Sequence, residues 1–344
     1  SFQALAWAGA CYHVARGYED NQKRHWCLGG LWFGFGMLSK LSMAIFAPLV
    51  FLYGLSNPHH RQRLLGWRPY IGLCLGLVLM LPLVAWNMDN DWRAFRHVAH
   101  QGGVSNTSWF VARYFGDYVL SQLALLSPLV FFLFLGAVGR PRGLRQTAPD
   151  SWIDRFLWMK AIPVFLLFAV LSTHTRVEGN WPAFGYLGAC VLMAARYRKR
   201  RLWRWSLGTA AAWSFLVLLQ AVFPVIPLPK KADRIAQELS DWRAVGQTVA
   251  DLTHSLPEDQ PPFIFAMNYQ MASLLAYYVP GQPLTVAVNR EKRPNTYDYW
   301  WTDEALLDRN AVGVGKHPDM AERLGRFFKS VDPPVAVTLY DHRR

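Results

Sequence analysis

Long apolar runs alternate with short polar segments over the first two thirds of the chain. A helix needs about 20 residues to cross a bilayer, and fewer when it is a short member of a buried hairpin. The pattern predicts eight membrane-crossing segments, namely 1–16, 26–39, 41–56, 70–86, 116–138, 156–172, 181–196 and 204–223. The glycines of "GLWFGFG" lie within one of these segments, where glycine favours close helix packing.

Lys and Arg divide the connections between these segments into two alternating groups. The basic connections are "ARGYEDNQKRH", "NPHHRQRLLGWR", "GRPRGLR" and "ARYRKRRLWR". They alternate with cation-poor junctions at Ser39-Lys40, 87–115 and 173–181. Because basic loops stay in the cytoplasm, we expect the cation-poor junctions and everything after about residue 224 on the opposite side. The pattern predicts a multi-pass protein of a bacterial inner membrane, with its C-terminal part in the periplasm.

The pattern changes after residue 224 to alternating helix and strand signals. Helices are predicted over 232–252, 269–279 and 319–331, and strands over 261–268, 283–288 and 333–340. Such alternation is typical of a small α/β domain with a mainly parallel sheet. The predicted fold is therefore a helical membrane bundle over 1–224 followed by an extramembrane α/β domain over 225–344.

Composition supports the membrane assignment and excludes other classes. Hydrophobic residues make up 52% of the chain and charged residues 17%, with a formal net charge of +13. The cations lie in connections between apolar runs and no basic groove motif accompanies them, so nucleic-acid binding is not expected. The sequence has no P-loop, nucleophile elbow or dinucleotide-binding glycine pattern.

Polar side chains at the cation-poor junctions are candidates for binding a charged lipid or a sugar. Lys40 could extend to lipid headgroups, or it could bind a phosphate. If residues 96–101 are helical, His97 and Gln101 lie on one face, and Arg96 and His100 on an adjoining one. Phosphate or sugar contacts are one interpretation, and an ordinary interfacial loop is the other. A divalent metal bound by His97, His100 and Glu178 is a weaker alternative.

The junction "THTRVEGNW" carries a cation, an anion and an amide beside Trp181. Asn180 suits a helix cap and Pro182 a first helical turn, which explains part of the motif. Glu178 could orient a sugar, hold a metal with a histidine, or pair with Arg176. Trp181 could anchor the chain at the interface or form a platform for a sugar ring.

The C-terminal domain contributes a fourth group of candidates. Tyr269 and Gln270 lie in a strand-to-helix turn, where α/β sheets present ligand groups. Tyr297 and Trp300 belong to "NREKRPNTYDYWW", which also carries Arg293 and Asn295. These planar, hydrogen-bonding side chains suit a carbohydrate, although packing onto the membrane domain is equally compatible.

Three motifs, in this order and spacing, resemble the bacterial glycosyltransferase family 39. They are "GFGMLSKLSMAIFAPLVFLYG", "LPLVAWNMDNDWRAFRHVAHQGG" and "RVEGNWPAFGYLGA". This group is related to protein O-mannosyltransferases and to the lipid A aminoarabinose transferase. The segments "YQMASLLAYYVPGQP" and "NTYDYW" are similar to the extramembrane domain of many bacterial members.

The resemblance implies a GT-C fold enzyme that moves a sugar from a polyprenyl-phosphate carrier to a lipid A, protein or glycan acceptor. In such families the catalytic carboxylate lies in the first extracytoplasmic loop, which we expect upstream of residue 1; the chain alone would then be inactive. Lys40 and Arg96 are the candidates for stabilising the carrier phosphate as it leaves. No nucleotide is required.

Two other classes are compatible with a polar face on a helical bundle. One is a transporter or flippase of lipid-linked saccharides, and the other is a non-catalytic scaffold whose outer domain binds a partner. Polar groups on one side of the membrane, rather than at its midplane, favour the transferase over the transporter.

Overall fold

The computed structural model describes residues 2–103, 110–139, 152–223, 225–226, 242–257, 261–288, 296–316 and 320–338. The chain divides into two compact units, residues 1–214 and residues 215–344. Each unit is described by itself. The assignment of the two domains to the membrane and the periplasm stays a prediction.

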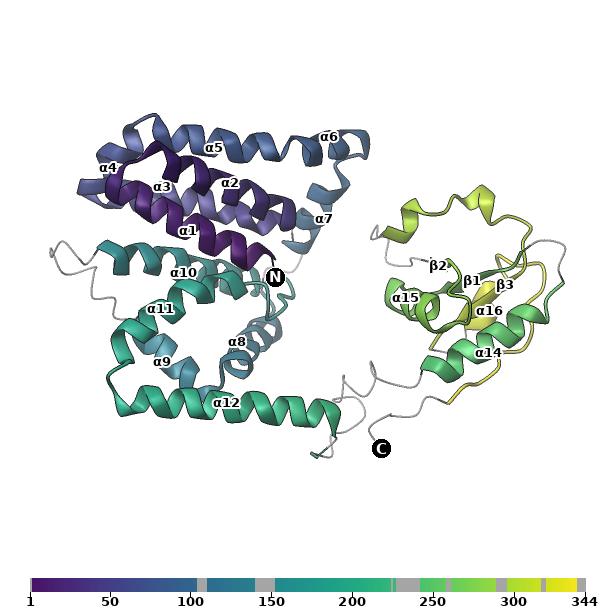
Figure 1. Ribbon diagram of the computed structural model, residues 1–344. Helices are drawn as coiled ribbons and strands as arrows, with labels where there is room; N and C mark the ends of the chain where they lie inside the picture. Colours follow the sequence, from purple (N-terminus) through teal and green to yellow (C-terminus); the bar gives the residue numbers. More distant parts are fainter. Residues whose placement is uncertain are drawn as a thin grey trace. The chain divides into compact units, whose positions relative to one another are not determined.

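The first unit is entirely helical in its described residues (Figure 1). Its α-helices are α1 (Phe2–Asp20), α2 (Lys23–Ser39), α3 (Phe46–Ser56), α4 (Pro58–Leu65), α5 (Arg68–Leu79), α6 (Leu81–Asp89), α7 (Arg93–Gln101), α8 (Ala112–Leu126), α9 (Pro128–Val138), α10 (Trp152–Leu171), α11 (Tyr186–Tyr197) and the larger part of α12 (Arg201–Val222), which crosses the boundary after residue 214. Two 3-10 turns, η1 (Leu41–Ile45) and η4 (Ala183–Gly185), precede α3 and α11. Every predicted apolar segment coincides with one helix or with two consecutive ones.

The structure does not confirm the eight predicted membrane crossings. Among the described helices, α12 alone is long and apolar enough to cross a membrane by length and composition, and up to three spans result if each of two bent pairs counts as one. The pair α5–α6 bends by 42° and the pair α8–α9 by 106°. The sharper bend lies at Ser127, whose φ is 66°, directly before Pro128, which disfavours a helical residue in front of it. The predicted segment 116–138 is therefore not one straight helix.

Glycines bring α2 and α5 into backbone contact. A Cβ at Gly30 would lie 1.8 Å from the carbonyl oxygen of Gly72, and one at Gly76 would lie 2.6 Å from the carbonyl oxygen of Gly30. Gly34 faces Gly76 in the same way. The glycines of "GLWFGFG" therefore have the predicted packing role, since no side chain fits between the two helices.

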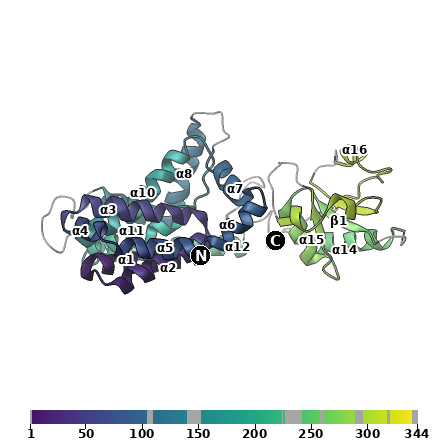
Figure 2. The same cartoon turned by 90° about the horizontal axis from the view of Figure 1, so that it is seen from above.

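The second unit contains a three-stranded parallel sheet in the order β2-β1-β3 (Figure 1), and Figure 2 shows α14 and α15 beside β1. The strands are β1 (Phe263–Ala266), β2 (Thr285–Ala287) and β3 (Ala311–Val314), with helices α14 (Trp242–His254), α15 (Tyr269–Tyr278) and α16 (Met320–Leu324) and short turns η5 (Thr296–Tyr299) and η6 (Asp303–Ala305). Alternate residues of β1 enter two apolar clusters: Ile264 and Ala266 pack with α14 and α15, and Phe263 and Phe265 pack with Phe328. The predicted parallel α/β arrangement is confirmed.

One strand and one helix of this unit were predicted wrongly. Residues 333–338 are not a strand, and the third strand is 311–314 instead. Glycine disfavours a strand, yet a Cβ at Gly313 would lie 2.4 Å from the ring of Phe265, so the strand pairs beside β1 only with glycine there. The predicted helix over 319–331 is reduced to α16, and residues 232–241 of the first predicted helix lie outside the described residues.

Candidate functional site

Three parts of the chain lie at one end of the first unit, here called the cation-poor end: the turn at residues 40–42, the described residues 101–103 and 110–111, and residues 173–181. The Thr175 hydroxyl donates a hydrogen bond to the Gln101 carbonyl oxygen at 3.3 Å, and the Val111 N–H donates to the carbonyl oxygen of Thr173. At the start of α1, the Gln3 amide donates to the Ser42 hydroxyl at 2.8 Å. Figure 1 shows α6, α7 and the end of α2 at this same end.

Trp7 links these segments inside the helical core. Its ring centroid lies 5.0 Å from that of Phe46, which follows the turn after Lys40, and 4.5 Å from that of Phe184, which follows the 173–181 stretch. Trp7 and Phe184 are fully buried. Packing of three large rings therefore fixes the two junctions relative to each other.

The basic connections gather at the other end, here called the cation-rich end and formed by residues 16–24, 57–68 and 196–204. The guanidinium of Arg68 donates to the Asn21 carbonyl oxygen at 3.0 Å, and Trp152, at the start of α10, packs its ring edge-on against His60 at 4.9 Å. Figure 1 shows α4, the start of α10 and the start of α12 at this end. The predicted "GRPRGLR" cations lie outside the described residues. Separation of the two groups of connections agrees with the predicted alternation, whereas their orientation in a membrane stays a prediction.

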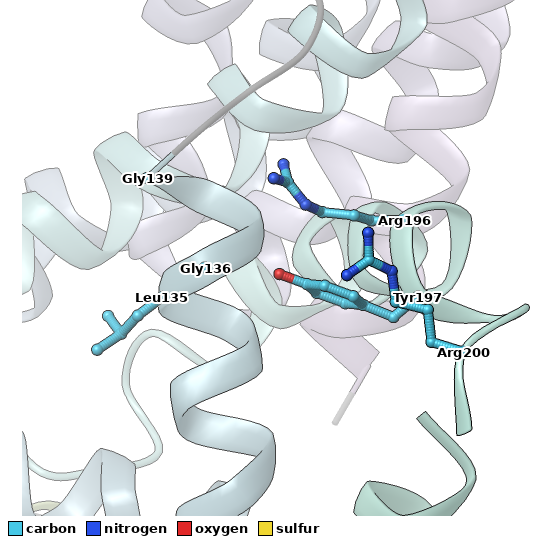
Figure 3. Close-up of a pocket in the computed structure, with 6 residues that line it drawn as sticks. All are labelled: Leu135, Gly136, Gly139, Arg196, Tyr197 and Arg200. Atoms are coloured by element: carbon cyan, nitrogen blue, oxygen red, sulfur yellow. The ribbon is translucent and has the colours of Figure 1, made fainter. Parts of the chain in front are cut away.

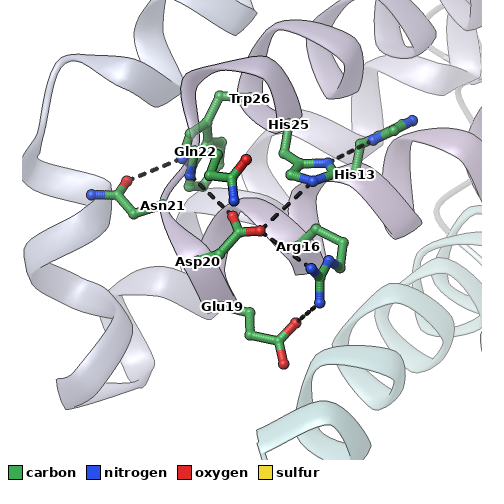
Figure 4. Close-up of polar contacts among 8 residues, drawn as sticks. All are labelled: His13, Arg16, Glu19, Asp20, Asn21, Gln22, His25 and Trp26. Carbon is green, nitrogen blue, oxygen red and sulfur yellow. Dashed lines mark hydrogen bonds and ion pairs between the residues drawn. The ribbon is translucent and has the colours of Figure 1, made fainter.

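A polar network closes the α1–α2 hairpin at the cation-rich end (Figure 4). The Nδ1 atoms of His13 and His25 lie 3.0 Å apart, and Asp20 accepts a hydrogen bond from the Gln22 N–H at 3.0 Å. Partial burial raises the pKa of Asp20, but that backbone hydrogen bond and the nearby His25 and Arg16 outweigh it, so the pKa is lowered. The network holds a turn and is not part of the predicted site.

The helix expected at residues 96–101 is present as α7. Asn87, which is fully buried, positions this helix: its side-chain oxygen accepts a hydrogen bond from the Ala94 N–H at 3.0 Å, and its amide donates to the Leu83 carbonyl oxygen at 2.8 Å. Arg96 and His100 are exposed and His97 is partly buried. Sequence reasoning missed Asn87, although an asparagine ending an apolar run was a signal of a cap.

The 173–181 stretch contains the predicted ion pair. Arg176 Nε lies 3.4 Å from Glu178 Oε1, and about half of each side chain is exposed. Trp181 is partly buried, and its ring lies 6.1 Å from that of Phe168, so it packs against the core. Asn180 does not cap the following helix with its side chain, because Pro182 occupies the cap position of η4. The exposed Asn180 side chain thus has no capping role.

Gln122 is a buried polar residue that the sequence analysis overlooked. Its amide donates to the Gly179 carbonyl oxygen at 3.0 Å, and its side-chain oxygen accepts a hydrogen bond from the Tyr186 hydroxyl. A Cβ at Gly179 would lie 2.9 Å from Ser121 Cβ, so the stretch lies directly against α8. A glutamine within the apolar run "YVLSQLALL" was the available signal, since amides in such runs face protein partners.

Lys40 ends α2 in an extended conformation and is exposed. Partial burial of its ammonium lowers the pKa of Lys40. Lys40, Arg96 and Arg176 are thus three exposed cations on segments that share the cation-poor end. Such a set can stabilise an anion without a metal, because an ammonium and guanidinium groups both bind phosphate oxygens.

The alternative metal site finds no support among the described residues. No three His, Cys, Asp or Glu side chains of the described ranges come close enough to hold a metal ion. His97, His100 and Glu178 therefore do not form a ligand set there. Glu178 is engaged by Arg176 instead.

The candidates of the second unit divide into exposed and buried side chains. Tyr269 and Gln270 are exposed at the start of α15, where the Asn268 side chain caps the helix by accepting a hydrogen bond from the Met271 N–H at 2.9 Å. Tyr297 is buried with its hydroxyl 2.9 Å from Ser273 Oγ, so its ring belongs to the core and is not available as a sugar platform. Trp300, at 55% exposure, packs beside it and leaves one face open. Arg293 and Asn295 lie outside the described residues.

Residues 1–86 match a protein-family model. Its description is dolichyl-phosphate-mannose-protein mannosyltransferase. Two curated proteins of Rhizobium johnstonii are similar over parts of the chain. One is the lipid A galacturonosyltransferase RgtD, 26% identical over 122 residues, which cover 36% of this chain and 25% of that protein. The other is the lipopolysaccharide core galacturonosyltransferase RgtB, 26% identical over 175 residues, which cover 49% of this chain and 35% of that protein.

These matches confirm the resemblance to GT-C glycosyltransferases. The aligned part spans about a quarter to a third of the length of the curated relatives. No solved structure matches the chain. The match over residues 1–86 includes Lys40 and the glycine contact between α2 and α5.

The surface of the first unit supports a membrane location. Large apolar side chains are widely exposed on it, among them Phe132 at 64%, Leu166 at 58% and Trp205 at 69%. Only Ser206 is buried among the residues of α12, which is apolar along its length. Apolar surface of this extent is typical of contact with lipid.

Proposed function

We propose that the chain is part of a membrane glycosyltransferase that moves a sugar from a polyprenyl-phosphate carrier to an acceptor at the outer face of a bacterial inner membrane. The observation that carries the proposal is the convergence of the cation-poor junctions on one end of a helical unit whose sequence resembles such transferases. A transporter would need polar groups near the middle of its helices rather than at one end.

The acceptor that we propose is a lipid A or core glycan rather than a protein. Both curated relatives are named for transfer to lipid A or to the lipopolysaccharide core. The periplasmic location of the second unit, and a role of Tyr269, Gln270 and Trp300 in acceptor binding, belong to the same proposal.

Lys40 and Arg96 would stabilise the carrier phosphate as the glycosidic bond to it breaks. Negative charge develops on the phosphate in the transition state, and a positioned cation lowers the barrier most when it contacts that charge. Arg176 is paired with Glu178, so it would hold the loop in place and leave the first two residues for the anion.

We assign no described carboxylate at the cation-poor end as the general base, the group that takes the proton from the acceptor hydroxyl. Asp91, Asp117 and Glu178 each have an arginine within 4.0 Å, and Asp89 is a further exposed carboxylate at the end of α6. The families that the chain resembles carry this base in their first extracytoplasmic loop, and none of these four carboxylates is proposed for the role.

Transfer by the full-length protein in nanodiscs tests the proposal, with a labelled polyprenyl-phosphate sugar as donor and lipid A as acceptor. Lys40→Ala and Arg96→Ala should each lower kcat on the order of a hundredfold. Lys199→Ala and Arg198→Ala, which remove the same charge at the cation-rich end, should transfer at the wild-type rate. An unchanged rate for Lys40→Ala and Arg96→Ala would remove the phosphate assignment, and no transfer by the wild-type protein to any lipid or glycan acceptor would remove the function.

A further inference from the structure

A pocket with a volume of about 420 Å³ lies at the cation-rich end, between α9 and the end of α11 (Figure 3). It is lined by Leu135, Gly136, Gly139, Arg196, Tyr197 and Arg200. It is separate from the cation-poor end, because α11 runs from the 173–181 side of the unit to the basic connection after Tyr197.

Two arginines and a hydroxyl converge on this pocket. The guanidinium carbons of Arg196 and Arg200 lie 5.7 and 5.9 Å from the ring centroid of Tyr197, so both groups are stacked near one aromatic ring. Figure 3 shows both guanidinium groups and the Tyr197 hydroxyl directed toward α9. Both guanidinium groups line the same pocket, so one bound anion could contact both of them.

The α9 wall of the pocket is free of bulky side chains. A Cβ at Gly136 would lie 2.8 Å from Tyr197 Oη, and Gly139 carries no side chain one turn further on. Among the described residues no group forms a hydrogen bond with the Tyr197 hydroxyl, which is therefore available to donate one into the pocket. Two guanidinium forks and one hydroxyl donor match the oxygens of a phosphate group.

The side chains of α9 beside the pocket are apolar and exposed. Leu135 lines the pocket at 44% exposure, and Phe132, one helical turn earlier on α9, is 64% exposed. These side chains continue the pocket onto the lipid-facing surface of α9. An acyl chain attached to the bound phosphate would lie along them, whereas a soluble phosphate would gain nothing from them.

We propose that the Arg196–Tyr197–Arg200 pocket binds the phosphate headgroup of an anionic phospholipid in the leaflet at the cation-rich end. Basic pockets between membrane helices recognise such headgroups through charge and direct hydrogen bonds. The bound lipid would link α9 and α11 beside the glycines of the pocket wall. The proposal is independent of the transferase function.

Native mass spectrometry of the full-length protein tests the pocket, after reconstitution in phosphatidylcholine nanodiscs that contain a minor fraction of phosphatidylglycerol. We expect selective retention of phosphatidylglycerol. Its apparent affinity should fall about fivefold for Arg196→Gln or Arg200→Gln and about thirtyfold for the double variant.

The matched control is Arg198→Gln/Lys199→Gln, which removes the same charge from exposed positions outside the pocket. This control should retain most of the phosphatidylglycerol affinity. An equal loss in both double variants would overturn the proposal, because it would indicate a diffuse surface charge. Displacement of the lipid by inorganic phosphate would also overturn it, in favour of a soluble anion.

Tyr197→Phe keeps the proposal testable if the double arginine variant does not fold. It removes one donor without changing the charge or the packing of the ring, and we expect a severalfold loss of phosphatidylglycerol affinity with an unchanged melting temperature. If Tyr197→Phe and each single arginine variant bound phosphatidylglycerol with wild-type affinity, these side chains would not form a phosphate-binding site.

Discussion

At the residue scale, the structure separates exposed polar side chains from those that serve the core. Arg176 and Glu178 form the ion pair that their spacing allowed, and Arg96 stays exposed. Tyr297 was a candidate sugar platform because of its aromatic ring, but its side chain packs in the core of the second unit beside Ser273. The sequence analysis did not single out Gln122 and Asn87, yet their buried side chains form hydrogen bonds that position the 173–181 stretch and α7. Burial decides between these roles, and burial depends on contacts with distant segments.

Lys160 is the most unusual single residue of the first unit. It is fully buried in α10, its Nζ has no hydrogen-bond partner among the described residues, and the rings of Phe46 and Phe156 lie 4.8 and 5.2 Å from it. Sequence reasoning placed it inside an apolar segment without comment. Its ammonium can gain only aromatic contacts there, which are weaker than the hydration that it loses.

Lys160→Met should therefore raise the melting temperature of the protein by a few degrees. Methionine keeps the length of the side chain and removes the charge, and replacement of a buried charge by an apolar group of similar volume is often stabilising. Differential scanning fluorimetry in detergent measures the effect, with the exposed Lys199→Met as a control that should shift it little. A lower melting temperature for Lys160→Met would mean that the ammonium stabilises the fold.

At the element scale, the helices followed from hydrophobic patterning, whereas the breaks in them did not. Eight apolar segments became helices, but α5–α6 and α8–α9 are bent at Met80 and Ser127. Pro128 stands directly after the second break and Pro82 two residues after the first, and these prolines were the available signals. In the second unit, the strand 311–314 is four residues long and carries a glycine, so its propensity did not reveal it.

Gly30→Ala tests the close approach of α2 and α5. The added Cβ would collide with the Gly72 carbonyl oxygen, which belongs to the backbone and cannot rotate away. We therefore expect the folded protein to lose about 3 kcal/mol of stability. Gly208→Ala in α12 is the matched control, because a Cβ there meets nothing within 4 Å and alanine favours a helix. Thermal unfolding of both variants is the measurement. Equal melting temperatures would contradict the packing contact.

His60 in α4 makes the stability of the cation-rich end dependent on pH. Its burial, helped by Arg63 and His59, lowers the pKa of His60 to about 4, and its Nδ1 lies 2.8 Å from the Tyr53 hydroxyl. Below a pH of about 6.5 the unfolded chain binds a proton at His60 that the folded chain does not bind until about pH 4. Stability is therefore lost as the pH falls from about 6.5 to about 4.

Melting temperatures measured across this pH range test the role of His60. His60→Gln should lose less stability than the wild type on acidification, whereas the exposed His254→Gln, in the second unit, should follow the wild type. The same acid dependence in His60→Gln and the wild type would assign the effect to other groups.

At the scale of the whole molecule, the alternation of basic and cation-poor connections predicts how the first unit is oriented in a membrane. The described contacts place the two groups of connections at opposite ends of the helical unit, as alternation requires. The positive-inside rule then predicts that residues 196–204 face the cytoplasm and residues 173–181 the periplasm.

Cysteine labelling of intact cells with a membrane-impermeant maleimide tests this orientation. Arg198→Cys should be labelled only after the cells are opened, and Asn180→Cys should be labelled in intact cells. The wild-type protein, with its four cysteines, is the background to subtract. Labelling of both variants from the same side would contradict the two-ended arrangement, and reversed labelling would contradict the predicted orientation.

The sequence by itself determined where the helices lie, which connections are basic, and that a parallel α/β unit follows a helical one. These features depend on local patterning, because apolar periodicity and charge act over a few residues. Only the tertiary structure decided which polar side chains are buried, where apolar segments break, and which strand completes the sheet. Those outcomes depend on contacts between segments far apart in the chain, such as Gly313 beneath Phe265 or Gln122 beside Gly179, and no local pattern encodes a partner.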